Sequence, residues 1–243
     1  MAAIETNINT WPQGVIPFVI SSDFKKGSQE YNEIAIAINE FNLRTNIRFI
    51  PRTDQADYII FKSGQSGWCS SQVGRQGGEQ SITCHLAGRQ FSAGNLIHEI
   101  MHMLGFHHEH QRADRDNYVK INFENVKRTF DFDMITGQNL TEYDYGSIMH
   151  YPGVIANTNL VKDPRKDTII PLKSLDVETI IGQRGRLSTQ DIQGINKLYP
   201  EVSGVKPLIL KTTLIEIELA SILILVFVVI TLCSMIRRSN NPT

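Results

Sequence analysis

Residues 98–116 read HEIMHMLGFHHEHQRADRD, and this stretch is the most informative part of the sequence about the fold and the site. It places His98 and His102 four positions apart, so on a helix both imidazoles project from the same face. Two neutral imidazoles at that spacing can bind one Zn²⁺ at about 2.0–2.1 Å. The stretch therefore predicts a helix that carries two ligands of a metal ion.

A third ligand is predicted just beyond that helix. Gly105 follows His102 by three residues, and a glycine can adopt the positive φ that turns the chain out of a helix. The turn brings His108 back toward the metal, whereas we assign the neighbouring His107 and His110 structural or solvent-facing positions. Three protein ligands plus a water molecule are typical of a catalytic zinc, since a structural zinc is normally closed by four.

Glu99 lies next to the first histidine, off the metal axis, where a carboxylate can hold a metal-bound water and accept its proton. The pattern HExxH alone occurs by chance on ordinary helices with two surface histidines. The longer pattern HExxHxxGxxH requires four histidine or glutamate positions and a glycine to coincide, so we interpret it as a functional site.

A second motif is SIMHY at residues 147–151. Met149 would form an apolar, polarizable floor beneath the three imidazoles. Tyr151 would place its phenol on the metal, or swing away to stabilise the oxyanion of a tetrahedral intermediate. Taken alone, both residues would be interpreted as core packing, and only the zinc motif beside them favours the functional interpretation.

Local patterns predict an α+β N-terminal half and a more irregular C-terminal half. Runs rich in β-branched and aromatic residues predict strands at 14–22, 46–51, 57–61 and 81–86, and apolar periodicity predicts helices at 28–43 and 93–107. Ser188-x-x-Asp191 begins a third helix in the manner of a capping box, and this helix ends near Tyr199. Between His108 and Ile170 the pattern loosens.

Composition sets limits on the class of protein. The chain has 243 residues, of which 41% are apolar and 20% charged, and this indicates a globular domain rather than a disordered chain. With 24 basic and 25 acidic residues there is no basic excess, so we expect no nucleic-acid partner.

Residues 219–236 read LASILILVFVVITLCSMI without a charge, and Arg237 and Arg238 follow. With residues 214–218 extending the helix, this run is long enough for one membrane span. A buried core helix is the alternative, but no amphipathic face marks one. We therefore predict a catalytic domain at 1–200, a linker at 201–213, a transmembrane helix at 214–236 and a tail at 237–243. The chain would be a single-pass membrane protein in contact with lipid, with an unpaired Cys233, and the flanking charges do not determine the side of its catalytic domain.

The stretch from Trp11 to Tyr199 resembles an astacin-family metalloprotease over nearly its whole length. The segments that carry the resemblance are WPQGVIPF at 11–18, RFIPRT at 48–53, HEIMHMLGFHHEHQRADRD at 98–116, YDYGSIMHY at 143–151 and IGQRGRLSTQDIQGINKLY at 181–199. The resemblance implies a metzincin-like α+β fold with a twisted mixed sheet and an active-site helix, cut by a cleft in which extended substrates bind along an edge strand. Arg184 would either favour acidic side chains on the leaving-group side of the cleft or form a structural salt bridge.

The same resemblance implies a set of roles. His98, His102 and His108 would bind one Zn²⁺ per chain, Glu99 would be the catalytic base, and Tyr151 would be a fifth, switching ligand. The implied activity is zinc-dependent endopeptidase cleavage of protein and peptide substrates. The alternative is a catalytically inactive, membrane-anchored zinc-binding module for adhesion or recognition, and the intact Glu99 and Tyr151 argue against it.

Two features of the family bear on the cysteines and on the N-terminus. Cys69 and Cys84, which by themselves could be bonded or free, match the shorter family disulfide, and we predict that they are bonded. The longer disulfide has no counterpart, because Asn46 and Pro200 or Glu201 stand at its places.

The N-terminus shows no signal segment with a basic and an apolar region. In the family, an α-amine pairs through water with the glutamate that follows the third zinc histidine, which is Glu109 here. Removal of Met1 would leave Ala2 to supply this amine. A frayed terminus is the alternative.

Overall fold

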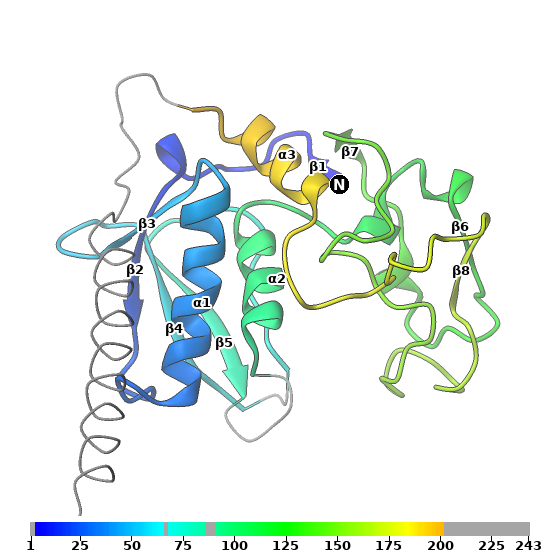
Figure 1. Cartoon of the computed structure of the whole chain (residues 1–243), viewed down its shortest axis with the longest axis horizontal. Helices are drawn as coiled ribbons and strands as arrows, with labels where there is room; N and C mark the ends of the chain where they lie inside the picture. The colour runs from blue at the N-terminus through cyan, green and yellow to red at the C-terminus, as the bar shows by residue number, and fades with distance from the viewer. Residues whose placement is uncertain (1–2, 66–67, 86–90, 202–243) are drawn as a thin grey trace, which may run out of the picture. The chain divides into compact units, whose positions relative to one another are not determined.

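The computed structural model describes residues 3–65, 68–85 and 91–201 (Figure 1). The predicted linker, transmembrane helix and tail lie outside these residues, apart from Glu201, and so do Cys233, Met1 and Ala2. Among the residues that are described, no helix has the length and apolarity needed to cross a membrane. The membrane anchor and the pairing of the N-terminal amine therefore stay predictions.

A parallel sheet forms one layer of the N-terminal half. Its strands are β2 (Val15–Ile20), β3 (Arg48–Pro51), β4 (Tyr58–Gly64) and β5 (Glu79–His85), in the order β3-β2-β4-β5. All three pairings are parallel, so the prediction of a mixed sheet is wrong for these strands. Strand β3 pairs with Val15–Phe18 of β2, and β4 pairs with Phe18–Ile20 on its other side. The chain therefore keeps its direction as it crosses from β3 to β4. Antiparallel pairing at the sheet is confined, within the described residues, to a bridge between Ser70 and Thr83 beside β5.

Two helices, α1 (Gln29–Arg44) and α2 (Ala93–Met103), form the second layer and contact each other (Figure 1). Each begins at a serine N-cap, Ser28 and Ser92, whose hydroxyl accepts a backbone N–H of the first turn. Apolar side chains of both helices join one core with the sheet. Helix α2 ends at Met103 rather than at the predicted residue 107, because Gly105 adopts a φ of 110° and turns the chain away.

The carbonyl groups at the end of α2 receive donors from three distant segments. The Trp11 indole donates to Met103 O at 3.2 Å, the Tyr199 hydroxyl donates to Leu104 O at 2.8 Å, and Gly74 N donates to His102 O at 2.9 Å. Helix ends leave carbonyls that need such partners when they are buried. These contacts fix the point at which the chain leaves α2.

The C-terminal half is irregular, as predicted. Its regular elements are short: β6 (Val119–Ile121), β7 (Gly137–Asn139), β8 (Ile169–Pro171), and 3₁₀ turns at Glu109–Gln111, Arg115–Asn117 and Thr129–Phe132. Strand β6 pairs antiparallel with β8, and β7 pairs antiparallel with β1 (Ala3–Glu5). Helix α3 (Thr189–Leu198) begins with the predicted capping box of Ser188 and Asp191. A further 3₁₀ turn at Pro12–Gly14 precedes β2.

The disulfide between Cys69 and Cys84 is present, as predicted. Hydrogen bonds occupy the place of the longer family disulfide. Asn46 N donates to Asn196 Oδ1 at 2.8 Å, and Asn46 Nδ2 donates to Tyr199 O at 3.0 Å. The segment before β3 is thus joined to α3 without a covalent bond.

We expect Asn196→Ala to lower the free energy of unfolding by about 1 kcal/mol, because it removes the acceptor of Asn46 N. Denaturant unfolding would measure the change. Gln193→Ala, on an exposed position of the same helix, is the control and should change stability little. Equal effects of the two substitutions would show that the contact with Asn46 does not help to hold α3.

Candidate metal centre and active site

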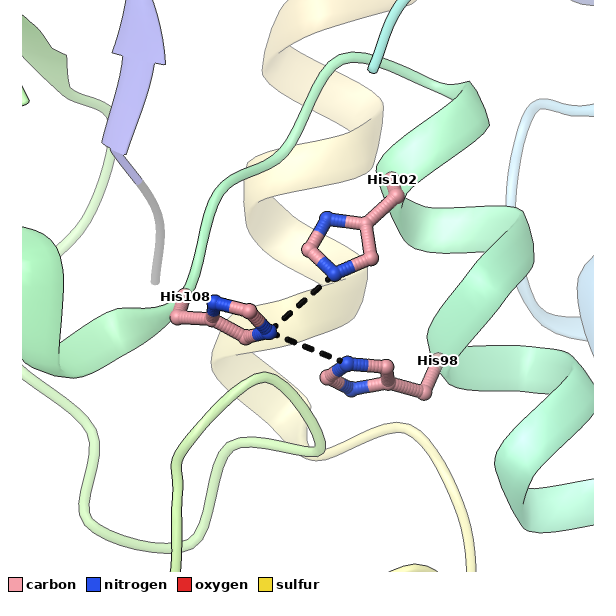
Figure 2. Close-up of side chains that lie close together, drawn as sticks. All are labelled: His98, His102 and His108. Atoms are coloured by element: carbon pink, nitrogen blue, oxygen red, sulfur yellow. Dashed lines mark hydrogen bonds between the residues drawn. The ribbon is translucent and has the colours of Figure 1, made fainter. Parts of the chain in front are cut away.

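The structure brings together the three histidines that the spacing singles out. His98 and His102 project from one face of α2, and His108 follows the turn at Gly105 (Figure 2). His108 Nε2 lies 3.3 Å from His98 Nε2 and 3.2 Å from His102 Nε2. A side chain at position 105 would lie 2.7 Å from Ile8, so both the space and the φ require glycine there.

Each of the three imidazoles uses its other ring nitrogen on an oxygen acceptor. His98 Nδ1 lies 2.9 Å from Ile148 O, His102 Nδ1 lies 2.8 Å from Phe106 O, and His108 Nδ1 lies 3.0 Å from Gln111 Oε1. An oxygen that only accepts assigns the ring proton to Nδ1, and this leaves a lone pair on Nε2. Gln111 was not predicted, although its position three residues after His108 could have suggested it.

Burial keeps these imidazoles neutral. It lowers the pKa of His102 to about 4 and holds the pKa values of His98 and His108 well below their usual range. Three Nε2 lone pairs therefore face one another, and the two short Nε2–Nε2 contacts are not hydrogen bonds. Tetrahedral coordination with Zn–N bonds of about 2.0–2.1 Å separates neighbouring nitrogens by about 3.3 Å. The donor set and its spacing thus fit one Zn²⁺.

Glu99 lies beside the three histidines with its side chain buried. Burial raises the pKa of its carboxyl to about 7, and a hydrogen bond from Ser71 acts in the opposite direction. The Ser71 hydroxyl lies 3.1 Å from Glu99 Oε2 and 2.8 Å from Glu99 O. Such a carboxyl can exchange a proton near neutral pH, as a general base must. No sequence pattern predicts a role for Ser71. The Cys69–Cys84 disulfide and the β-bridge between Ser70 and Thr83 place its segment next to helix α2.

Tyr151 lies against the same site. Its ring centroid is 4.5 Å from that of His108 and 4.3 Å from that of His110. Burial raises the pKa of its phenol to about 12, so the hydroxyl keeps its proton at neutral pH and can donate. Arg184 Nη1 donates to the carbonyls of His150 and Gln183. No ion pair of Arg184 occurs in the described part of the chain, and both alternatives for this residue stay predictions.

The segment 147–149 supplies main-chain contacts beneath the histidines. Ile148 O accepts from His98, Met149 O accepts from Glu109 N at 3.0 Å, and the Met149 side chain is buried in the core. Glu109 is itself buried, and its Oε1 accepts from Asp144 N at 2.8 Å and from Arg112. The motif thus joins α2 to the irregular half.

The two remaining histidines of the stretch do not join the group of three. His107 Nε2 lies 3.0 Å from a carboxylate oxygen of Glu5, and His110 Nε2 lies 3.0 Å from Asp131 O. His110 is completely buried, so its place is structural, whereas His107 is half-buried.

Helix α2 backs the sheet and carries the HExxH motif, a third histidine follows a glycine turn, and a buried methionine segment lies beyond it. This combination defines the metzincin class of zinc peptidases. Residues 3–200 match the model of the astacin peptidase family. The chain belongs to this family.

Individual relatives give the same result. High choriolytic enzyme 1 of Oryzias latipes is 41% identical over 190 residues, which are 76% of this chain and 66% of the relative. Zinc metalloproteinase nas-14 of Caenorhabditis elegans is 39% identical over 196 residues, 78% of this chain and 37% of the relative. The solved structure of high choriolytic enzyme 1, a hatching enzyme zinc-protease of the medaka, aligns with a TM-score of 0.69 at 39% identity and covers 79% of this chain and 93% of its own. This chain spans between 37% and 66% of the length of these two curated relatives.

We expect the purified chain to contain one Zn²⁺, which a strong chelator removes. His102→Ala should abolish stoichiometric zinc, because it removes one of three converging lone pairs. His107→Ala is the matched control, since this histidine lies in the same stretch but outside the group, and it should keep the metal. Zinc content by elemental analysis would decide, and a His102→Ala protein with a full equivalent of zinc would exclude this centre.

Proposed function

We propose that this chain is a zinc-dependent metalloendopeptidase, with His98, His102 and His108 as its zinc ligands. The observation that carries the proposal is the convergence of three unprotonated Nε2 atoms beside a buried glutamate of raised pKa. When bound there, zinc would act as a Lewis acid on a substrate carbonyl and make a bound water acidic.

Glu99 is the general base in this proposal. Its carboxyl is held by Ser71 next to the histidine group, where an ionised carboxylate can take a proton from water and return it to the leaving amine. Tyr151 is the oxyanion donor, because its phenol stays protonated and its ring lies against His108.

We infer that the substrate is an extended polypeptide. A cavity of about 270 Å³ opens beside the histidines and is lined by Ser71, Val73, His102, His107, His108, Gln111, Phe130 and Asp131. The segment at Ser70 and Ser71 runs along the outer edge of β5, where strand addition would align a substrate backbone with Glu99. Arg184, which makes no close ion pair within the described residues, is a candidate for binding acidic side chains on the leaving-group side.

The alternative, a catalytically inactive zinc-binding module for adhesion or recognition, is not favoured. A module that only holds zinc has no need of a buried carboxyl with a raised pKa beside the metal, since burying it costs free energy. Family membership also favours the peptidase.

Glu99→Gln should keep zinc and reduce peptide hydrolysis by about 10²–10⁴-fold, because only the proton acceptor is removed. Cleavage of a generic protein substrate, measured together with zinc content, tests this. Glu124→Gln, at an exposed position, is the control and should cleave at the parent rate. Undiminished cleavage by Glu99→Gln would refute the mechanism, and an inactive parent chain with full zinc would favour the binding module.

Ser71→Ala should move the acidic limb of the kcat/KM profile to higher pH. The Ser71 hydroxyl stabilises the ionised carboxylate and so lowers the pKa of Glu99, and its removal raises that pKa. Because the base acts only when ionised, activity is then lost at a higher pH, while the alkaline limb stays in place. Ser70→Ala, whose hydroxyl contacts Thr83 instead, is the control. An acidic limb that stays in place or moves to lower pH would contradict the assignment of that limb to Glu99.

A further inference from the structure

A buried carboxylate stands at the end of a row of hydrogen bonds that begins on the metal centre. His98 Nδ1 donates to Ile148 O at 2.9 Å. The N–H of the same peptide group, on Met149, donates to Ser147 Oγ at 3.0 Å. Ser147 Oγ in turn donates to Asp191 Oδ1, on helix α3, at 2.7 Å. One peptide group and one hydroxyl thus connect a histidine of α2 with a carboxylate of α3.

The direction of every proton in this row follows from the partners. The peptide N–H and C=O are fixed as donor and acceptor. Since Ser147 Oγ accepts the Met149 N–H, its own proton is free to point at Asp191. The second carboxylate oxygen, Oδ2, accepts from Ile148 N at 3.0 Å and Ser188 N at 2.9 Å. All bonds therefore donate toward the carboxylate, and hydrogen bonds aligned in this way polarise one another.

The row is shielded from solvent. Ser147, Ile148, Met149 and Asp191 are 0% exposed, and His98 is 7% exposed. Low local polarity strengthens hydrogen bonds of this kind, and it makes a missing partner costly. The Nδ1 atoms of His102 and His108 contact Phe106 O and Gln111 Oε1. Of the three ligand histidines, His98 is the one whose Nδ1 is linked by hydrogen bonds to Asp191.

We propose that Asp191 is a positioning residue of the metal centre, which acts through Ser147 and the peptide group 148–149 to hold His98 as a zinc ligand. The row fixes the Nδ1–H tautomer and the orientation of the ring, and it increases electron density on Nε2. Histidine ligands of zinc commonly donate directly to a carboxylate with these effects. Here a peptide group and a hydroxyl lie between the two. The inference rests on the proposed zinc site.

Two roles of Asp191 must be separated, because the same carboxylate also completes the capping box of α3. Ser188→Ala removes the cap of α3, since Ser188 Oγ accepts from Asp191 N and donates to Asp144, but it leaves the row to His98 intact. Ser147→Ala interrupts the row and leaves the cap. Asp191→Asn keeps the shape of the side chain and removes its charge.

The experiment is zinc affinity of the purified full chain, measured by competition with a chromophoric chelator at one pH, with the His98 Nδ1–H resonance of the zinc-loaded protein as a second readout. Ser147→Ala and Asp191→Asn should bind zinc about 10-fold more weakly and move the resonance upfield. Ser188→Ala should leave both unchanged while lowering thermal stability.

Several outcomes would overturn the inference. One is parental zinc affinity in folded Ser147→Ala. Another is an equal loss of affinity in Ser188→Ala, which would show that affinity follows the stability of α3. If Ser147→Ala does not fold, Asp191→Asn gives the same comparison. A parent chain that binds no zinc would instead refute the proposed function, before any variant is compared.

Discussion

Three imidazole nitrogens without protons converge at the centre of the candidate site, with His108 Nε2 3.2–3.3 Å from the Nε2 atoms of His98 and His102, and several distant parts of the domain hold them there. Lone pairs so close together repel, and a cation bound among them would relieve the repulsion, so the arrangement favours a metal site. Each ring is held from behind by an oxygen on its Nδ1, and burial prevents protonation from relieving the repulsion. The oxygen acceptors of the three Nδ1 atoms therefore contribute to the geometry of the site as much as the imidazoles do.

The third nitrogen depends on how α2 ends. His98 and His102 are aligned by the period of one helix, but His108 reaches them only because the chain leaves the helix at Gly105 in one direction. Trp11 and Tyr199, which come from opposite ends of the domain, bind the last carbonyls of α2. The hydrogen bonds of Asn46 hold the segment of Tyr199 in place, at the position where the family resemblance implies a second disulfide. The metal centre therefore depends on the closure of the whole domain.

The glutamate proposed as the base shows how burial and the polar contacts that oppose it together set the pKa of a carboxyl. Burial alone would favour the neutral acid, and the Ser71 hydroxyl opposes this by stabilising the carboxylate. Ser71 reaches the helix because a disulfide between Cys69 and Cys84 fastens its segment to β5. The covalent bond thus contributes to the position of a polar contact as well as to the stability of the fold.

The sequence by itself determined several features that depend on residues close along the chain, although it did not give the end of α2 at Met103 or the contact of Gln111 with His108. The HExxHxxGxxH spacing, the capping box at Ser188 and the pairing of Cys69 with Cys84 could be predicted, the last from a family resemblance. The sequence could not determine that the strands of the sheet are parallel. The residue pattern of a strand indicates which of its faces is buried, but not the direction of the neighbouring strand. Nor could the sequence identify Ser71, Ile148 O or Asp191 as partners of the site. These contacts join residues 28, 50 and 44 positions apart, and spacing carries information only over a few turns of a helix. Tertiary structure alone decided them, because only the folded domain brings such distant donors and acceptors within hydrogen-bond distance.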